Sequence, residues 1–256
     1  MNMQVAEPTL LNHIVDYWND RAASYSHENR LELDSEQRTI WTEVLLKNAP
    51  EKPCLNVLDV GTGPGFFAII LALAGHKVTS VDVCGEMIGR ARQNAQAYGV
   101  EIDFLQSDVH QLALAENSFD LIVCRNVTWT LENPEEAYAH WYELLNPEGR
   151  LLVFDANWYM HLFDAQFAQG FKEDRANTVT FGVADHYEGT DTVAMEAIAR
   201  RLPLSSILRP QWDLQTLSAI GFRKCVADTE IWQQVWNEEE KINGASTPMF
   251  MVVSHK

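Results

Sequence analysis

One short turn constrains the fold of this 256-residue chain more than any other stretch. An apolar run, Val57-Leu58-Asp59-Val60, ends in Gly61-Thr62-Gly63-Pro64-Gly65, and an apolar segment with helical character follows from Phe66 to Leu73. This order predicts a buried strand, a tight turn and a helix. Glycine adopts positive φ and carries no Cβ, and a helix start presents free N–H groups with partial positive charge. We therefore expect a ligand on this turn.

What the turn lacks narrows the kind of ligand. The dinucleotide fingerprint needs a third glycine three residues after the second, and Phe66 stands there instead. A Walker A loop ends in Gly-Lys-Ser/Thr, and the turn contains no lysine. A phosphate-binding loop is therefore disfavoured. A turn that only connects a strand to a helix remains the alternative.

The pattern that is left, D-x-G-x-G-x-G, resembles the nucleotide loop of the class I S-adenosylmethionine (SAM) dependent methyltransferases. The resemblance implies SAM as cofactor and S-adenosylhomocysteine as product. It places the loop backbone against the methionine part of SAM, with Asp59 orienting the loop and the amino end of the ligand. The implied cofactor contacts in the turn are Asp59, Gly61, Thr62, Gly63 and Gly65.

A second apolar segment, from Val78 to Val83, contains a carboxylate near its end. Asp82 lies 21 residues after Gly61, which is the spacing at which α/β nucleotide folds place an acid against a ribose. A helix N-cap is the alternative role for Asp82. By resemblance, Val83 contacts the cofactor and Met87 packs on the adenine, although Met87 is equally well explained as core.

A third predicted strand, residues 101–106, leads to another strand-end acid, Asp108. In the resembling family this aspartate accepts a hydrogen bond from the adenine amino group, and the next backbone N–H, here that of Val109, reaches a ring nitrogen. The alternative is that Asp108 only caps a short helix. Three successive strands thus end in candidate ligand carboxylates.

A fourth strand, Leu121–Cys124, opens into Arg125, Asn126 and Trp129. Ligands of doubly wound sheets bind beyond the carboxyl ends of the strands. We therefore expect Arg125 and Asn126 beside the cofactor, and we expect Trp129 to offer an aromatic face to the substrate. Packing against the next helix is the alternative for Arg125 and Trp129.

The order of the elements predicts one α/β domain with a Rossmann-like, doubly wound, seven-stranded sheet whose last strand is antiparallel. An N-terminal helical cap covers residues 1–50, with its first helix at about 10–23, and Tyr25 resembles a tyrosine that closes over SAM in small-molecule methyltransferases. The core takes residues 54–157 and 211–256, and a helical insert after strand 5 takes residues 158–210. The acidic run 238–240 is expected to be a solvated loop.

The insert is long for a connection, so we expect it to form a lid over the acceptor and to set specificity. Trp158, Tyr159 and Tyr187 are candidate substrate contacts, and His161 or His186 is a candidate general base. We predict no metal, because the histidines lack short ligand spacing. Three arginines in this region, Arg200, Arg201 and Arg209, are expected to form surface salt bridges, with an anionic substrate as the alternative.

The composition limits the partners. The formal net charge is −17 with 19 basic residues, which argues against nucleic acid because phosphate contacts need clustered Lys and Arg. Four cysteines without C-x-x-C spacing indicate reduced thiols and a cytoplasmic location. No apolar run approaches 18 residues, so membrane insertion is not expected. A homodimer is compatible with the sequence.

We therefore expect a SAM-dependent methyltransferase similar to the type 11 and ubiquinone-biosynthesis-like subgroup, transferring a methyl group to a small molecule by in-line displacement. Catalysis would come mainly from proximity and orientation. Two alternatives stay open. One is a non-catalytic SAM-binding or ligand-sensing module, and the other is a nicotinamide-dependent oxidoreductase, against which Phe66 counts.

Overall fold

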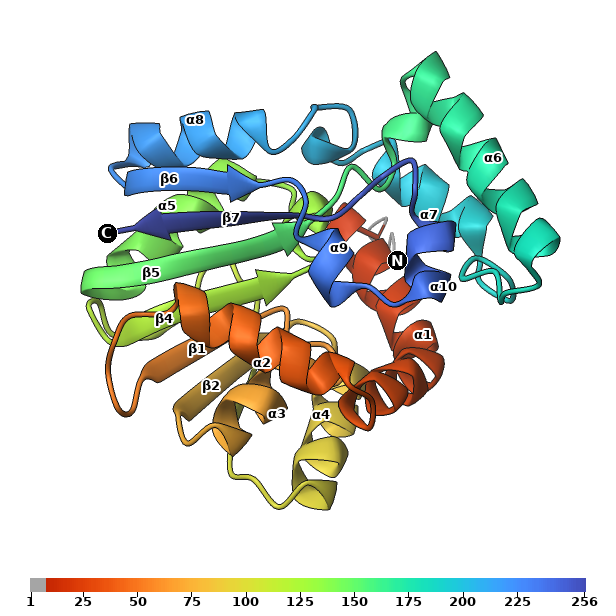
Figure 1. Cartoon of the computed structure of the whole chain (residues 1–256). Helices are drawn as coiled ribbons and strands as arrows, with labels where there is room; N and C mark the ends of the chain where they lie inside the picture. Colours follow the sequence, from red (N-terminus) through yellow and green to blue (C-terminus); the bar gives the residue numbers. More distant parts are fainter. Residues whose placement is uncertain (1–7) are drawn as a thin grey trace, which may run out of the picture.

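A seven-stranded sheet forms the centre of the protein, and the computed structural model describes residues 8–256 (Figure 1). The strand order is β3-β2-β1-β4-β5-β7-β6. The strands are β1 (Asn56–Val60), β2 (Lys77–Asp82), β3 (Asp103–Gln106), β4 (Phe119–Arg125), β5 (Leu145–Asp155), β6 (Arg223–Asp228) and β7 (Phe250–His255). The first five are parallel, and β7 runs antiparallel between β5 and β6. The predicted fold class, with its antiparallel last strand, is confirmed.

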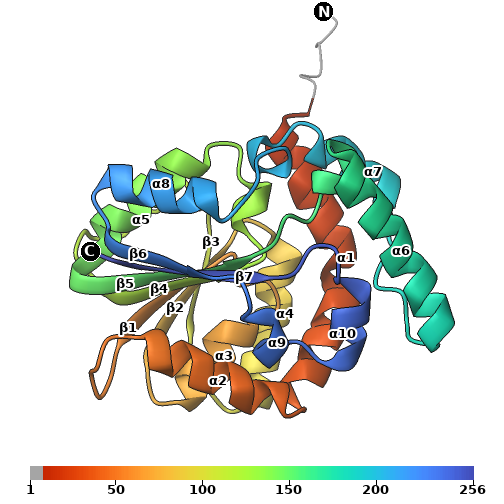
Figure 2. The ribbon, with the colours of Figure 1, turned by 45° about the horizontal axis from the view of Figure 1, so that its top comes forward.

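Helices cover both faces of the sheet (Figure 2). One face carries α2 (Gln37–Asn48), α3 (Phe66–Leu73) and α4 (Gly85–Ala97), and the other carries α5 (Pro134–Leu144) and α8 (Gln211–Ile220). Alternate strand residues feed the two cores: Val57 and Val123 point to the first, and Leu58 and Ile122 point to the second. Strands that are apolar at most positions, on both faces, are what a sheet buried on both sides requires.

Helix α1 (Leu10–Leu33) is ten residues longer than the predicted helix of about 10–23, so that boundary was wrong. The helix begins at Thr9, whose side chain forms a capping box with Asn12. Its second half packs on α4 partly through buried polar groups, and Asn94 donates a hydrogen bond to the Ser26 hydroxyl at 3.1 Å. Because these buried positions are polar, the hydrophobic period that marks a helix fades after Ala23.

Helix α2 belongs to the hydrophobic layer beneath the sheet. Trp41 is 1% exposed and packs edge-on against three phenylalanines, with ring centroids 5.1 to 6.5 Å apart. Two of them, Phe66 and Phe67, open α3, and the third, Phe154, lies in β5. The residue that replaces the third glycine of a dinucleotide loop is therefore a core aromatic.

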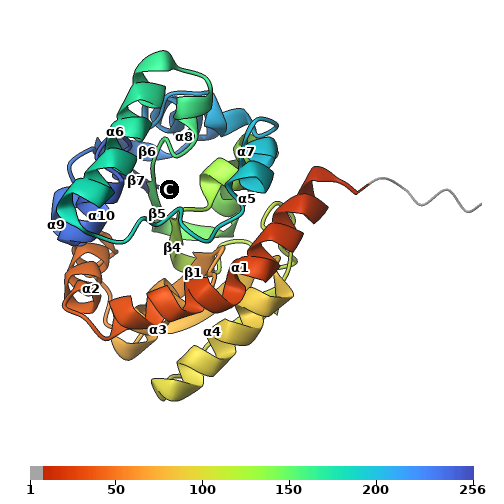
Figure 3. The ribbon, with the colours of Figure 1, turned by 90° about the vertical axis from the view of Figure 1, so that its right-hand side faces the viewer.

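The remaining helices gather where the parallel strands end (Figure 3). They are η1 (Thr128–Thr130), η2 (Met160–Leu162), α6 (Ala165–Phe181), α7 (Thr192–Ala199), η3 (Pro203–Ser205), α9 (Trp232–Val235) and α10 (Glu238–Asn243). The predicted loop at 238–240 was wrong, because Asn237 and Glu240 form a capping box and the acidic run becomes the first turn of α10. Among residues 8–256, none of the helices combines the length and apolar character needed to cross a bilayer.

The insert is fixed to the C-terminal segment by polar contacts. The carboxylate of Asp174 in α6 accepts hydrogen bonds from the backbone N–H and the hydroxyl of Ser246, at 3.0 and 2.6 Å. The guanidinium of Arg175 donates to the side chain of Asn243 at 3.1 Å and also contacts its carbonyl oxygen and Asp185. Helix α6 is thus held against α10.

Candidate functional site

A cavity of about 270 Å³ opens at the carboxyl ends of β1, β2 and β4. It brings together ten predicted cofactor contacts from five separate stretches: Tyr25, Gly61, Gly63, Asp82, Val83, Met87, Asp108, Val109, Arg125 and Asn126. A smaller cavity of about 30 Å³ shares Tyr25, Gly61, Gly63 and Arg125 with it and adds Asp59 and Thr62. β1 lies between β2 and β4, at the point where the sheet order reverses, which is where such sheets bind ligands.

The glycine turn passes closely beneath the loop that follows β4. Gly61 has φ +63°, and a Cβ there would lie 2.4 Å from Cγ2 of Val127. Gly63 has φ +53°, and a Cβ there would lie 3.5 Å from the ring of Tyr25. Backbone conformation and close approach therefore both require glycine at Gly61.

Asp59 holds the turn from within. Its Oδ2 accepts hydrogen bonds from the Thr62 hydroxyl at 2.6 Å and from the backbone N–H of Ala68 in α3 at 3.1 Å. The residue is 2% exposed, and burial raises the pKa of its carboxyl group from 3.8 to about 7, although both hydrogen bonds act the other way. Asp59 thus ties the end of β1 to the start of α3.

Asp82 ties the same turn to the next strand. Its Oδ2 accepts from the backbone N–H of Gly63 and its Oδ1 accepts from that of Cys84, both at 2.9 Å. Burial raises the pKa of this carboxyl group, and the residue is 8% exposed at the wall of the larger cavity. Cys84, rather than Asp82, is the N-cap residue of α4.

Asp108 is the most accessible of the strand-end acids, with 41% of its side chain exposed. Its Oδ1 pairs with Nδ1 of His110 at 2.6 Å and accepts from the His110 backbone N–H at 2.9 Å. Nε2 of His110 lies 3.4 Å from the backbone nitrogen of Asn133, which links the loops after β3 and β4. His110 also lines the cavity and was not predicted, although Asp108 is a turn-forming residue whose side chain can bond the backbone two residues on.

Arg125 is not free to meet a ligand with its whole guanidinium. It forms a two-pronged ion pair with Glu32 of α1 at 2.6 and 2.9 Å, and the ring of Phe66 lies 4.4 Å away. Burial disfavours its charge, but the Glu32 carboxylate outweighs this and raises the pKa. Glu32 was missed because it lies beyond residue 23, where the first helix was predicted to end.

Asn126 has the left-handed conformation, with φ 60°, at the end of β4. Its N–H donates to the Phe154 carbonyl at 2.8 Å, and its carbonyl oxygen accepts from the indole N–H of Trp129 at 3.1 Å. Within residues 8–256, its buried Oδ1 has no hydrogen-bond partner. An unpaired buried acceptor beside a cavity marks a place for a ligand donor.

The predicted substrate contacts lie around the two cavities described above, not on their walls. Trp129 is 6% exposed and stacks on Tyr159 with centroids 4.9 Å apart, and the Trp158 indole N–H donates to Asp155 at 3.0 Å. Tyr187 packs edge-on against Phe171 at 5.1 Å. Their roles with an acceptor stay predictions.

The two histidines of the insert differ in their surroundings. The side chain of His161 is 7% exposed, whereas that of His186 is 44% exposed and reaches Glu239 at 3.1 Å. The structure places neither on the two cavity walls. In the part of the chain from residue 8 onward, no three His, Cys, Asp or Glu side chains are placed to hold a metal ion.

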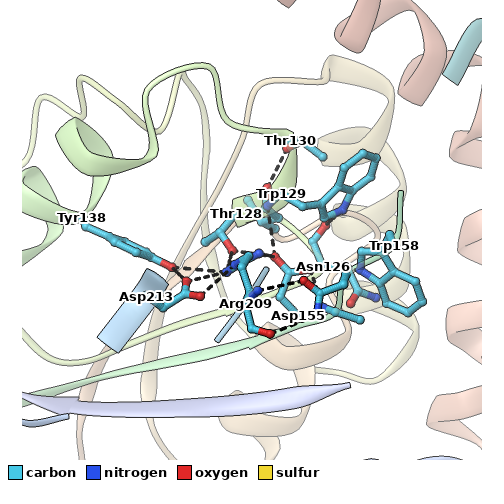
Figure 4. A network of polar contacts seen from close by, with 12 residues as sticks. Asn126, Thr128, Trp129, Thr130, Tyr138, Asp155, Trp158, Arg209 and Asp213 are labelled. Carbon is cyan, nitrogen blue, oxygen red and sulfur yellow. Dashed lines mark hydrogen bonds and ion pairs between the residues drawn. The ribbon is translucent and has the colours of Figure 1, made fainter. Parts of the chain in front are cut away.

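A buried network of charged and polar side chains joins β5, η1 and α8 next to the site (Figure 4). Arg209 was expected at the surface, and this was wrong, because its side chain is fully buried with those of Asp155 and Asp213. The guanidinium reaches these carboxylates at 2.7 and 2.6 Å and donates to Thr128 at 2.6 Å, while the Tyr138 hydroxyl donates to Asp213 at 2.6 Å. Such a buried charge is tolerated only when it is paired in this way.

Comparisons with known proteins agree with this geometry. A family model described as a methyltransferase domain matches residues 58–153. The ubiquinone/menaquinone biosynthesis C-methyltransferase of Bdellovibrio bacteriovorus is 33% identical over 139 residues, 52% of this chain and 57% of that protein. The demethylmenaquinone methyltransferase of Thermus thermophilus is 31% identical over 117 residues, 45% and 53% of the two chains. The chain thus spans about half the length of the curated relatives it matches.

The fold is also found among solved structures. Phosphoethanolamine N-methyltransferase 2 of Haemonchus contortus, in complex with S-adenosyl-L-methionine, matches with a TM-score of 0.60 at 14% identity. The match covers 84% of this chain and 52% of that chain. At this level of identity the likeness shows the fold alone.

Replacing Gly61 by alanine tests the close approach of the turn. We expect Gly61→Ala to lower the free energy of unfolding by about 2 kcal/mol or more, because it adds a clash with Val127 to the cost of positive φ. Gly99→Ala is the matched control, since Gly99 has φ +68° with nothing within 4 Å of its Cβ position, and it should cost only about 1 kcal/mol. Urea denaturation measures both, and equal losses would contradict the close approach.

The raised pKa of Asp59 predicts a pH dependence of stability. A carboxyl group whose folded pKa exceeds its unfolded value destabilises the fold progressively as the pH rises between the two, here from 3.8 to about 7. Relative to Asp59→Asn, the ligand-free wild type should therefore lose stability from about pH 4 to about pH 7, and the difference should level off above that. Urea midpoints across this range measure it, and a difference independent of pH would refute the raised pKa.

Proposed function

We propose that the chain is a class I SAM-dependent methyltransferase that transfers a methyl group from SAM to a small-molecule acceptor. The match of residues 58–153 to a methyltransferase domain and the similarity to two named methyltransferases support this. The observation that carries the proposal is the meeting of the glycine turn, Asp82 and Asp108 at one cavity at the sheet switch point. Three strand ends supply them. A ligand with an adenosine and no phosphate matches this set.

The residues of the cavity fit SAM by their chemistry. Asp82 and Asp108 offer carboxylate oxygens to the ribose hydroxyls and to the adenine amino group, while Met87 and Val109 offer apolar walls. Within the described residues, the arginine on the cavity wall, Arg125, is already paired with Glu32. Acids without a free cation suit a positively charged ligand and not a dinucleotide phosphate.

When bound, SAM supplies a methyl group on a positively charged sulfur, which is a good leaving group. The task left for the chain is to orient the reactants, which can lower a barrier by roughly 7 to 11 kcal/mol. The glycine turn, which Asp59 and Asp82 hold by hydrogen bonds, forms one wall of the site. The ring of Tyr25 in α1 lies over Gly63 of this turn. Asn126 lines the same cavity, and among residues 8–256 its Oδ1 has no hydrogen-bond partner.

The acceptor is proposed to be a small aromatic molecule that binds beneath the insert. The relatives named for ubiquinone and menaquinone synthesis support an aromatic ring, and so do the aromatic side chains of the insert. The net charge of −17 supports a small molecule over a nucleic acid. A cytoplasmic location and a homodimer stay predictions.

Cofactor binding tests the assignment of Asp82. We expect Asp82→Ala to weaken SAM and S-adenosylhomocysteine binding by about 1.5 to 3 kcal/mol, roughly 10- to 100-fold, because a charged hydrogen-bond acceptor is lost. Asp103→Ala removes the same charge from an exposed position outside the cavity and should bind like wild type. Calorimetry measures both variants. NADH binding to the wild type without SAM affinity would instead favour a nicotinamide enzyme.

Transfer of labelled methyl from SAM to a library of phenols, quinols, amines and small acids tests the activity itself. The proposal predicts transfer to at least one aromatic acceptor, with stoichiometric S-adenosylhomocysteine. Tight SAM binding with no transfer to any compound would favour a SAM-binding or sensing module.

A further inference from the structure

The two carboxylate oxygens of Asp108 on the cavity wall are used differently. Oδ1 accepts a hydrogen bond from the backbone N–H of His110 at 2.9 Å and a second one from the ring Nδ1 of the same residue at 2.6 Å. Between residues 8 and 256, no hydrogen bond reaches Oδ2, although Asp108 lines the cavity. One oxygen is therefore occupied by the protein, and the other is available to a donor on a ligand.

The second ring nitrogen of His110 defines which nitrogen carries the proton. The backbone N–H of Asn133, the N-cap residue of α5, donates to Nε2 at 3.4 Å. Since a backbone N–H can only donate, Nε2 must accept and Nδ1 must carry the proton. The Nδ1–H group then donates to the Asp108 carboxylate, which can only accept. Both contacts require the same neutral form, so the ring is held at both nitrogens.

His110 is more buried than the acid that it contacts. Its side chain is 14% exposed, whereas that of Asp108 is 41% exposed. His110 lies on the cavity wall together with Leu131 and Asn133 of the segment between β4 and α5. An exposed aspartate side chain would otherwise sample several rotamers in water, and a ligand that binds it would have to order it. The buried ring orders Asp108 before the ligand arrives.

Two other side chains already anchor the backbone of the loop after β3. The indole N–H of Trp141 donates to the carbonyl oxygen of Val109 at 3.0 Å, and the N–H of Leu112 donates to Nε2 of His140 at 3.1 Å. Trp141 and His140 both belong to α5. The loop thus stays attached to α5 without the ring of His110, whose own contribution is to the side chain of Asp108.

We propose that His110 is a positioning residue that holds Asp108 for the adenine amino group and thereby sets the preference of the cavity for adenine over purines that lack this group. The inference rests on the proposed binding of SAM. The adenine amino group is a hydrogen-bond donor, and the free Oδ2 of Asp108 accepts from it. A purine with hydrogen in place of the amino group cannot form this bond, so its binding gains nothing from an ordered Asp108.

Calorimetry with two ligands tests the preference for adenine. The ligands are S-adenosylhomocysteine and its 6-deamino analogue, in which hydrogen replaces the adenine amino group. His110→Ala should weaken binding of S-adenosylhomocysteine about 3- to 10-fold, the usual cost of ordering one side chain, and that of the analogue by less than about 2-fold. Because partial unfolding would lower both apparent affinities equally, their ratio isolates the effect on adenine. A ratio equal to that of the wild type would overturn the proposal.

Three further variants separate positioning from loop stability. His140→Ala is the matched control, because His140 bonds the backbone of the same loop from outside the cavity wall, and it should keep the wild-type ratio. His110→Asn supplies an amide N–H in place of the Nδ1–H group and should restore most of the ratio, whereas His110→Phe keeps a ring without a donor and should lose it. An equal loss of the ratio in His140→Ala, or a full ratio in His110→Phe, would overturn the proposal.

A double-mutant cycle asks whether His110 acts through Asp108. In the background of Asp108→Ala, His110→Ala should change the ratio of the two affinities no further, and additive losses would overturn the proposal. Equal affinities of the wild type for the two ligands would also overturn it, while the proposed SAM site would stand. A wild type that binds neither SAM nor S-adenosylhomocysteine would overturn the proposed function together with the inference.

Discussion

The site depends on two buried carboxylates that hold one glycine turn. Asp59 accepts a hydrogen bond from the start of α3. Asp82 accepts one from the N–H of Gly63 and one from the start of α4. Both pay a desolvation cost, seen in their raised pKa values, which backbone hydrogen bonds partly offset. Because the turn approaches Val127 too closely for a Cβ, it also fixes the loop after β4. The cavity therefore has preformed walls on three strands.

Two sets of buried ion pairs connect the strand ends to the surrounding helices. Arg125 connects the end of β4 to α1 through Glu32, and α1 carries Tyr25 over the turn. Arg209 connects β5 to α8 through Asp155 and Asp213 and also holds Thr128 of η1. Removing one partner from such a buried network costs several times more than a surface pair, about 3 to 5 kcal/mol. The ends of β4 and β5 are thus held by fixed charges next to the aromatic pair of Trp129 and Tyr159.

Local signals made the lining of the cavity predictable from the sequence. The glycine turn and the acids at the ends of β1 and β2 and after β3 each lie in one short stretch, and the parallel topology brings them together. Glu32 and Arg125 lie 93 residues apart, and Arg209 and Asp155 lie 54 apart, so nothing local marks either pair. The end of α1 was not predicted because its buried positions are polar. The 238–240 run was predicted as a loop, but a capping box makes it the first turn of a helix. The periodicity of a sequence predicts helices and strands, but it does not predict which polar side chains far apart in the chain will pair.

A crystal structure of the protein with S-adenosylhomocysteine tests the assignment of the cavity most directly. The ribose should hydrogen-bond to Asp82, the adenine should lie beside Asp108 and Met87, and the amino-acid end should reach the turn between Asp59 and Gly65. Adenosine bound away from both carboxylates, or a ligand that leaves the turn untouched, would contradict the assignment.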